Sequence, residues 1–175
     1  MKKLFLVLIS AFLLFGCGLK KTTPTVTPTP ASTTFELTDK EMPEINLTAS
    51  DDGHWLTLKI NKIPSSIVNI EYELLYRASE SGLEIEKGLG DTLKVEGRSL
   101  ERKLLLGTES CTNGCKYKFD ENVTGGDLNL TLINQQGQTA TIQKFFTLVK
   151  DKKSKKIVAT LTDASSSASP AQGNN

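Results

Sequence analysis

Hydrophobic and polar residues alternate along most of the chain from about residue 35 onward. Every second residue is apolar in the segment 45–49, and the same alternation returns in 56–60 after the turn sequence Asp51-Asp52-Gly53. A period of two residues is typical of a strand with one buried face, so these segments predict a β-hairpin. The longest alternating segment, 68–76, predicts a strand of an antiparallel sheet that is buried on one face and wet on the other.

Further short apolar segments follow, and no segment beyond the N-terminal region keeps a helical period of 3.6 over ten residues. Glycine-rich sequences separate the segments and are typical of turns, among them Gly88-Leu89-Gly90-Asp91 and Gly125-Gly126. Eight to ten short strands at this spacing predict an all-β fold, a two-sheet antiparallel sandwich. The further strand candidates are 83–87, 92–96, 100–106, 116–119, 128–134 and 140–149, with 157–162 left open as a final strand.

The segment from Ile70 to Arg77 reads IEYELLYR, and it is preceded by Trp55 and Pro64. It resembles the third strand of fibronectin type III and related immunoglobulin-like domains, and the resemblance covers about a third of the chain. The resemblance implies an immunoglobulin-like architecture and nothing about activity, because such sandwiches carry many functions.

The first seventeen residues form a secretory signal pattern. Two lysines precede an apolar run over residues 4–15, which is too short to span a membrane and is followed by Gly16-Cys17. Leu14, Gly16 and Cys17 resemble the lipobox of bacterial lipoproteins. The resemblance implies that residues 1–16 are removed and that Cys17 receives a diacylglycerol thioether, which anchors the protein to the outer face of the cytoplasmic membrane or to an outer membrane. An ordinary cleaved signal or an uncleaved anchor is the alternative.

Two polar segments flank the predicted sandwich. Residues 17–34 contain Cys17, which is expected to carry the lipid, and a Thr/Pro-rich stretch. Three prolines in this stretch favour extended geometry, so we expect a linker. Residues 164–175 are small and polar, so we expect a disordered tail. The β-sandwich domain is therefore expected over residues 35–163.

Charge is balanced over the whole chain of 175 residues, with a formal net charge of +1, but it is distributed unevenly. This balance argues against a nucleic-acid-binding protein. Residues 35–149 contain 12 Lys and Arg against 18 Asp and Glu, a net charge of −6, and residues 150–156 then reverse the sign. Lys152, Lys153, Lys155 and Lys156 are a candidate contact surface for an anionic polymer, a membrane or an acidic partner. The alternative is a solvated turn whose lysines protect a sheet edge.

Cys111 and Cys115 are the only cysteines besides Cys17, and Asn113-Gly114 lies between them. In an exported protein, two cysteines that close so short a loop most simply form a disulfide at the tip of a hairpin. Free thiols are one alternative. A metal site is another alternative. The nearest non-thiol candidates are Glu109 and Lys116, and the only histidine of the chain is His54, so we expect no metal.

No arrangement of residues in the sequence indicates catalysis. His54 is the only histidine, and its place after Asp51-Asp52 suggests an acid–base pair but is more simply a polar turn. The acidic turns at Asp51-Asp52 and at Asp120-Glu121-Asn122, with Asp127, fit no known calcium loop. We expect no catalytic residue and no cofactor. We therefore expect a non-catalytic, lipid-anchored, extracytoplasmic β-sandwich module that binds a protein or glycan of the envelope or takes part in envelope assembly. The alternative is a solute- or ligand-binding lipoprotein that serves a transporter or sensor. The oligomeric state stays open.

Overall fold

The structure is a computed structural model that describes residues 33–112 and 114–164. The predicted signal peptide, Cys17, the linker up to residue 32 and the tail from residue 165 lie outside the described residues. Ten strands and no α-helix are present in these ranges. The strands are β1 (Glu44–Ala49), β2 (Trp55–Asn61), β3 (Ile67–Glu80), β4 (Leu83–Lys94), β5 (Ser99–Leu105), β6 (Gly107–Ser110), β7 (Lys116–Phe119), β8 (Gly125–Asn134), β9 (Thr139–Lys150) and β10 (Ile157–Asp163).

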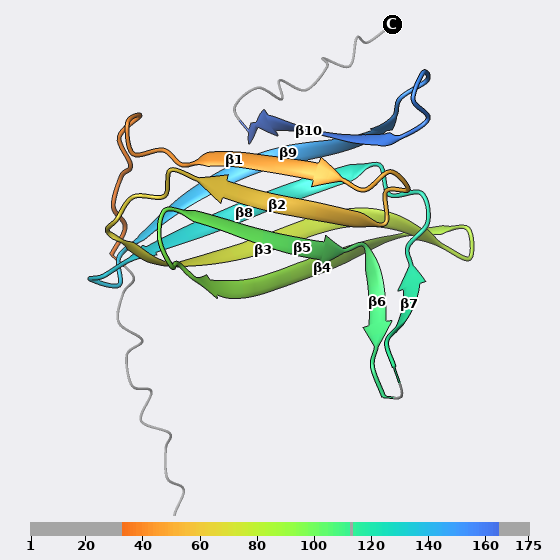
Figure 1. Cartoon of the computed structure of the whole chain (residues 1–175), viewed down its shortest axis with the longest axis horizontal. Helices are drawn as coiled ribbons and strands as arrows, with labels where there is room; N and C mark the ends of the chain where they lie inside the picture. The colour runs from red at the N-terminus through yellow and green to blue at the C-terminus, as the bar shows by residue number, and fades with distance from the viewer. Residues whose placement is uncertain (1–32, 113, 165–175) are drawn as a thin grey trace, which may run out of the picture. The chain divides into compact units, whose positions relative to one another are not determined.

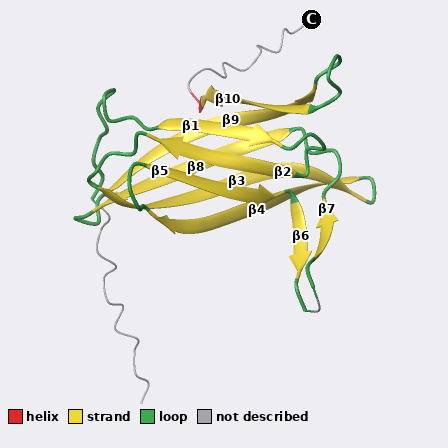
Figure 2. Ribbon diagram, viewed as in Figure 1, coloured by secondary structure: helices red, strands yellow, loops and turns green. Residues whose placement is uncertain are grey.

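The strands form three antiparallel sheets, and the prediction of an all-β antiparallel fold is confirmed. A three-stranded sheet has the order β1-β2-β5, and a five-stranded sheet has the order β10-β9-β8-β3-β4. The short strands β6 and β7 form a separate hairpin that leaves the other two sheets (Figure 1). Figure 2 shows how far strands dominate the described chain, with loops at the two ends of the larger sheets and at the tip of the β6–β7 hairpin.

Alternating side chains of the two larger sheets meet in one buried hydrophobic cluster. The inward residues of β2 are fully buried, as the alternation over 56–60 predicts. Ile70, Leu74 and Tyr76 of β3 are buried in the same cluster as inward residues of β8 and β9. One cluster takes residues from both of the larger sheets, and we call these two sheets together the sandwich. The largest buried side chains are Tyr76, Phe146, Leu56, Leu58, Ile60, Ile63, Ile70, Leu74, Leu106, Leu128, Leu130 and Leu132.

Strand β4 corrects one prediction, because Gly88-Leu89-Gly90-Asp91 is not a turn. The strand runs through both glycines, which pair with Leu75 and Glu73 of β3. Two inward positions of β4 are charged, and they interrupt the apolar alternation that is typical of a half-buried strand. Lys87 forms an ion pair with Asp120, and Asp91 lies 3.1 Å from Arg102 of β5. Ion pairs thus take the place of apolar side chains at this edge of the sandwich.

Three other elements also differ from the prediction or complete it. Residues 157–162 do form the final strand, β10, which pairs with β9. Strand β6 went unpredicted because its four residues contain no apolar side chain. Residues 35–43 form no strand; the backbone N–H of Phe35 donates to the Thr139 carbonyl over 3.0 Å, and Thr34 forms an isolated bridge with the same residue.

The described chain begins at one end of the sandwich and the β6–β7 hairpin leaves the opposite end. Thr139 lies next to the first described residues, and it pairs with Ile133 of β8. The hairpin precedes the other end of β8, where Gly125 pairs with Thr147. Figure 1 shows the β6–β7 hairpin at the same end as the β9–β10 loop. We call this end, with residues 50–54, 79–83, 107–112, 114–124 and 150–157, the hairpin end.

Candidate binding surface at the hairpin end

The β6–β7 hairpin projects from the sandwich and buries almost none of its own side chains. Every described residue from Thr108 to Phe119 is exposed. The strands pair from Gly107↔Phe119 to Ser110↔Lys116. An isolated two-stranded hairpin is at best marginally stable in water, so other contacts must hold this one in place.

A polar network fixes the base of the hairpin. The Tyr76 hydroxyl donates to Asp120 Oδ2 over 2.8 Å, and Lys87 forms an ion pair with the same carboxylate. The backbone N–H of Gly107 hydrogen-bonds the Tyr76 hydroxyl. The Asp120 side chain is only 6% exposed, and burial together with this carboxylate raises the pKa of Tyr76. One buried tyrosine thus holds both ends of the hairpin.

Gly107 begins the hairpin where two backbone segments cross closely. Its φ is +153°, and a Cβ at this position would lie 2.2 Å from the Lys118 carbonyl oxygen. Any other residue would collide with the backbone of the partner strand, so the base of the hairpin requires glycine here.

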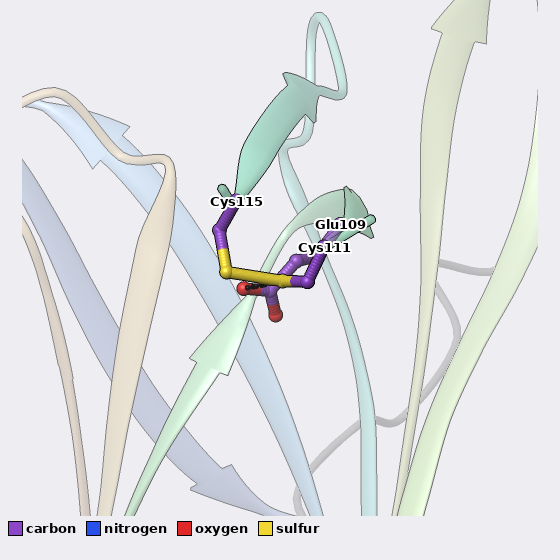
Figure 3. Close-up of a disulfide and its surroundings, with 3 residues drawn as sticks. All are labelled: Glu109, Cys111 and Cys115. Carbon is purple, nitrogen blue, oxygen red and sulfur yellow. Dashed lines mark hydrogen bonds between the residues drawn. A yellow bond between two sulfur atoms is a disulfide. The ribbon is translucent and has the colours of Figure 1, made fainter. Parts of the chain in front are cut away.

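A disulfide closes the tip of the hairpin. Cys111 and Cys115 lie at disulfide distance from each other, as the sequence predicted. Figure 3 shows the bond and the Glu109 carboxylate, whose Oε1 lies 3.1 Å from Cys111 Sγ. Glu109 and the two cysteines lie within metal-ligating distance of one another, but the disulfide uses both sulfur atoms. The oxidised tip therefore offers a metal only the carboxylate.

Four aromatic side chains gather between the hairpin and the β1–β2 turn, and we call them the aromatic cluster: His54, Trp55, Tyr117 and Phe119. The rings of His54 and Phe119 are stacked with centroids 4.1 Å apart. Trp55 meets Tyr117 edge to face at 5.5 Å. Tyr117 is nevertheless 45% exposed and Phe119 36% exposed. Exposed large aromatic side chains that are held in fixed positions are typical of binding surfaces.

Polar side chains border the aromatic cluster. Lys103 Nζ of β5 lies 4.4 Å from the centroid of the Trp55 ring, in a cation–π contact. The Tyr117 hydroxyl donates to the Glu109 carboxylate, which raises the pKa of Tyr117. A surface hollow of about 300 Å³ lies beside Trp55 and is also lined by Arg102, Lys103 and Glu109. The surface therefore combines aromatic faces with hydrogen-bonding groups of both charges.

The lysine loop between β9 and β10 lies at the same end of the domain. Asp151 shapes it by accepting hydrogen bonds from the Ser154 backbone and hydroxyl and from the Lys153 backbone, and these bonds lower the pKa of Asp151. Lys156 Nζ lies 2.8 Å from Asp51 Oδ2. The described residues provide no ionic partner for Lys152, Lys153 or Lys155. Part of the predicted contact surface is thus free, and Lys156 is paired.

The two predicted acidic turns come together at the hairpin end. Asp52, Asp120 and Glu121 line one hollow of about 380 Å³. Asp120 is already engaged by Tyr76 and Lys87. Asp52 accepts a hydrogen bond of 2.5 Å from the Ser50 hydroxyl and another from the backbone of His54, and both lower its pKa. Asp127 lies away from this group and lines a hollow on the outer face of the five-stranded sheet.

His54 does meet an acidic side chain, because its Nδ1 lies 3.1 Å from Asp52 Oδ2. Both residues belong to the same turn, and one face of the imidazole stacks on the Phe119 ring. The arrangement fixes the turn against the hairpin. The described residues place no serine, cysteine or second acid–base group in hydrogen-bond contact with the His54 ring.

The sequence indicated the disulfide and the lysine loop of this surface but not the aromatic cluster. Tyr117 and Phe119 alternate with lysines in the predicted strand 116–119, directly after the cysteine pair. Exposed aromatic residues on a hairpin whose tip is cross-linked were the available signal. The contribution of Trp55 depends on the folded β1–β2 turn and had no local signal.

No protein-family model matches the sequence, and no curated protein matches it either.

Proposed function

We propose that this chain is a non-catalytic, lipid-anchored module of a bacterial cell envelope that binds an envelope macromolecule through its hairpin end. Cys17 and the Thr/Pro-rich stretch after it supply the anchor and a spacer. Thr34 already pairs with Thr139 of the domain, so at about 3.1 Å per residue the 11 residues from Thr22 to Ser32 would reach roughly 34 Å if extended.

One observation carries the proposal: a projecting hairpin at the hairpin end holds exposed aromatic side chains in fixed positions. The β6–β7 hairpin contributes no residue to the core cluster, yet its tip is cross-linked and a buried network holds its base. Such contacts are needed to present the exposed Tyr117 and Phe119 in one orientation. Binding residues on a projecting loop that a rigid scaffold positions are the usual arrangement in β-sandwich modules.

The strand order supports an immunoglobulin-like architecture for the module. The first, second and fifth strands share one sheet, and the third and fourth share the other with the three strands that follow the hairpin. Fibronectin type III domains divide their strands between two sheets in this way. Relative to a fibronectin type III domain, β10 is an added edge strand, and β6 and β7 lie within the connection from β5 of one sheet to β8 of the other.

The alternative, a solute-binding lipoprotein, is less well supported. A hollow of about 580 Å³ lies against the outer face of the five-stranded sheet and is lined by Glu71, Glu73 and Asn129. Small-molecule sites are mostly apolar and enclose their ligand, and here the space between the sheets is filled by the core side chains.

The anchor is tested with Cys17→Ser in the cells that make the protein. We expect the wild type to incorporate radiolabelled palmitate and to sediment with membranes, and the variant to lose the label and enter the soluble fraction. Labelling that persists in the variant contradicts the lipoprotein assignment.

The binding surface is tested by cosedimentation of the Cys17→Ser protein with isolated envelope material, which removes the contribution of the lipid. Tyr117→Ala should reduce the bound fraction at least fivefold. Met42→Ala is the matched control, because Met42 is 41% exposed but lies in the segment before β1, away from the hairpin end. Equal losses for both variants, or no binding of the parent protein, overturn the proposal.

A further inference from the structure

We propose that the ligand of the aromatic cluster is an anionic glycan, a saccharide chain that carries carboxylate or phosphate groups. This inference rests on the proposed function and names the chemistry of the ligand for the same surface. The aromatic cluster would contact the sugar rings, and the unpaired lysines of the hairpin end would contact the acidic groups.

The aromatic part of the argument concerns shape and hydrogen bonding. A pyranose ring has a face of C–H groups that packs on an aromatic ring and an edge of hydroxyl groups that needs donors and acceptors. Tyr117 and Phe119 offer exposed ring surface, and their planes are inclined by only 8°. Glu109 and Lys103 stand beside them with an acceptor and a donor.

The size of the hollow beside Trp55 also fits this ligand. Its volume is about 300 Å³, at the lower end of the range for small-ligand sites. Its lining residues Arg102, Lys103 and Glu109 are polar, and Trp55 provides the aromatic wall. A hollow of this size accepts a ring or two of a polymer that continues across the surface.

The charge part of the argument depends on which lysines are unpaired. Several lysines have no ionic partner among the residues described: Lys116 of the hairpin and Lys152, Lys153 and Lys155 of the loop. Lys103 has none either, and its Nζ lies over the Trp55 ring. Residues 35–149 carry a net charge of −6, so this group of cations is a local exception. On a domain that is otherwise negative, a local group of unpaired cations attracts an anionic ligand to this end rather than to the rest of the surface.

Lysines neutralise three of the carboxylates at the hairpin end. Glu80 pairs with Lys118 at 2.8 Å, Asp51 pairs with Lys156, and Asp120 pairs with Lys87. Four carboxylates keep their negative charge, because neutral donors do not cancel it and because Glu121 has no ionic partner among the described residues: Asp52, Glu109, Glu121 and Asp151. Six lysines are unpaired there as well: Lys103, Lys116, Lys150, Lys152, Lys153 and Lys155. The excess of unpaired charge is therefore two positive charges.

The experiment uses the full-length, lipidated protein in detergent micelles and measures binding by biolayer interferometry. Polygalacturonate, hyaluronate and a poly(ribitol phosphate) teichoic acid are the anionic glycans. Fully methyl-esterified polygalacturonate keeps the sugar rings without the charge, and poly-L-glutamate keeps the charge without the rings. We expect at least one anionic glycan to bind, with at least tenfold weaker binding to both controls.

Substitutions separate the two parts of the surface. Tyr117→Ala and Lys103→Gln should each weaken binding at least fivefold, whereas Met42→Ala should not change it. Binding should also fall as salt is raised from 50 to 300 mM, because exposed charges are screened.

Three results would overturn the inference: no binding of any anionic glycan, equal binding of poly-L-glutamate, or wild-type affinity of Tyr117→Ala. The proposed function is judged separately by envelope cosedimentation. If that binding still depends on Tyr117 while no anionic glycan binds, the ligand is of another class, such as a protein, and only this inference fails.

Discussion

The sandwich and the β6–β7 hairpin are stabilised in different ways within one chain. Strands such as β2 and β8 place alternate side chains in the core, where Leu58 and Leu130 are fully buried. The hairpin has no buried face, and a disulfide, a polar network and ring contacts hold it. Burial stabilises the sandwich in proportion to area, whereas the hairpin depends on a few specific bonds. The comparison teaches that substitutions in the two regions should differ in size and in how far their effects spread.

The largest effect is expected in the sandwich, from Leu130→Ala. The substitution removes a fully buried side chain at the centre of β8 and leaves a cavity, which should lower the free energy of unfolding by about 2–5 kcal/mol. Urea unfolding measures the change, and Thr141→Ala on the exposed face of β9 is the control, with an expected change below about 0.5 kcal/mol. Similar changes for both variants would contradict the core assignment.

An intermediate effect is expected where the two regions join, from Asp120→Asn. The substitution leaves Lys87 without its counter-charge and weakens the acceptor of the Tyr76 hydroxyl, so stability should fall by about 1–3 kcal/mol. Glu80→Gln is the matched control, because it breaks only the exposed pair with Lys118 and should leave the stability almost unchanged. If Asp120→Asn costs no more than the control, the network does not hold the hairpin.

A local effect is expected at the tip from the double substitution Cys111→Ser with Cys115→Ser. Closing so short a loop stabilises the hairpin by about 2 kcal/mol in the chain-entropy account. We expect faster amide hydrogen exchange at Glu109 and Tyr117, with the main unfolding transition almost unchanged, because the hairpin contributes nothing to the core. If the free energy of the main unfolding transition fell by the full contribution of the disulfide, the hairpin and the sandwich would unfold together.

The smallest effect is a pH dependence from Tyr76. Burial and the Asp120 carboxylate raise the pKa of the folded tyrosine, whereas its pKa in the unfolded chain is about 10. Above pH 10 the unfolded chain loses this proton and the folded chain keeps it, so unfolding becomes easier as pH rises. The stability advantage of the wild type over Tyr76→Phe should therefore shrink, by roughly 1 kcal/mol between pH 9 and 11.

Thermal unfolding of both proteins across this pH range measures the difference. A constant difference between the two proteins would show that Tyr76 titrates alike in the folded and unfolded chains.

The same contrast explains what the sequence predicted. Core strands repeat the alternation of apolar residues, so 56–60 and 68–76 were identified from the pattern alone. Strand β4 was divided wrongly because Lys87 and Asp91 occupy inward positions, and their partners Asp120 and Arg102 are distant in sequence. The aromatic cluster was missed for the same reason, since Trp55 and Tyr117 are neighbours only after folding.

The backbone at the base of the hairpin has a consequence for how such a chain changes over time. Asp120 N–H donates to the Leu106 carbonyl over 3.0 Å, so the chain leaves and re-enters the sandwich at adjacent points. We therefore expect that a hairpin of another length can replace the β6–β7 hairpin without moving β5 or β8. The scaffold would then keep its strands while the surface at this end changes.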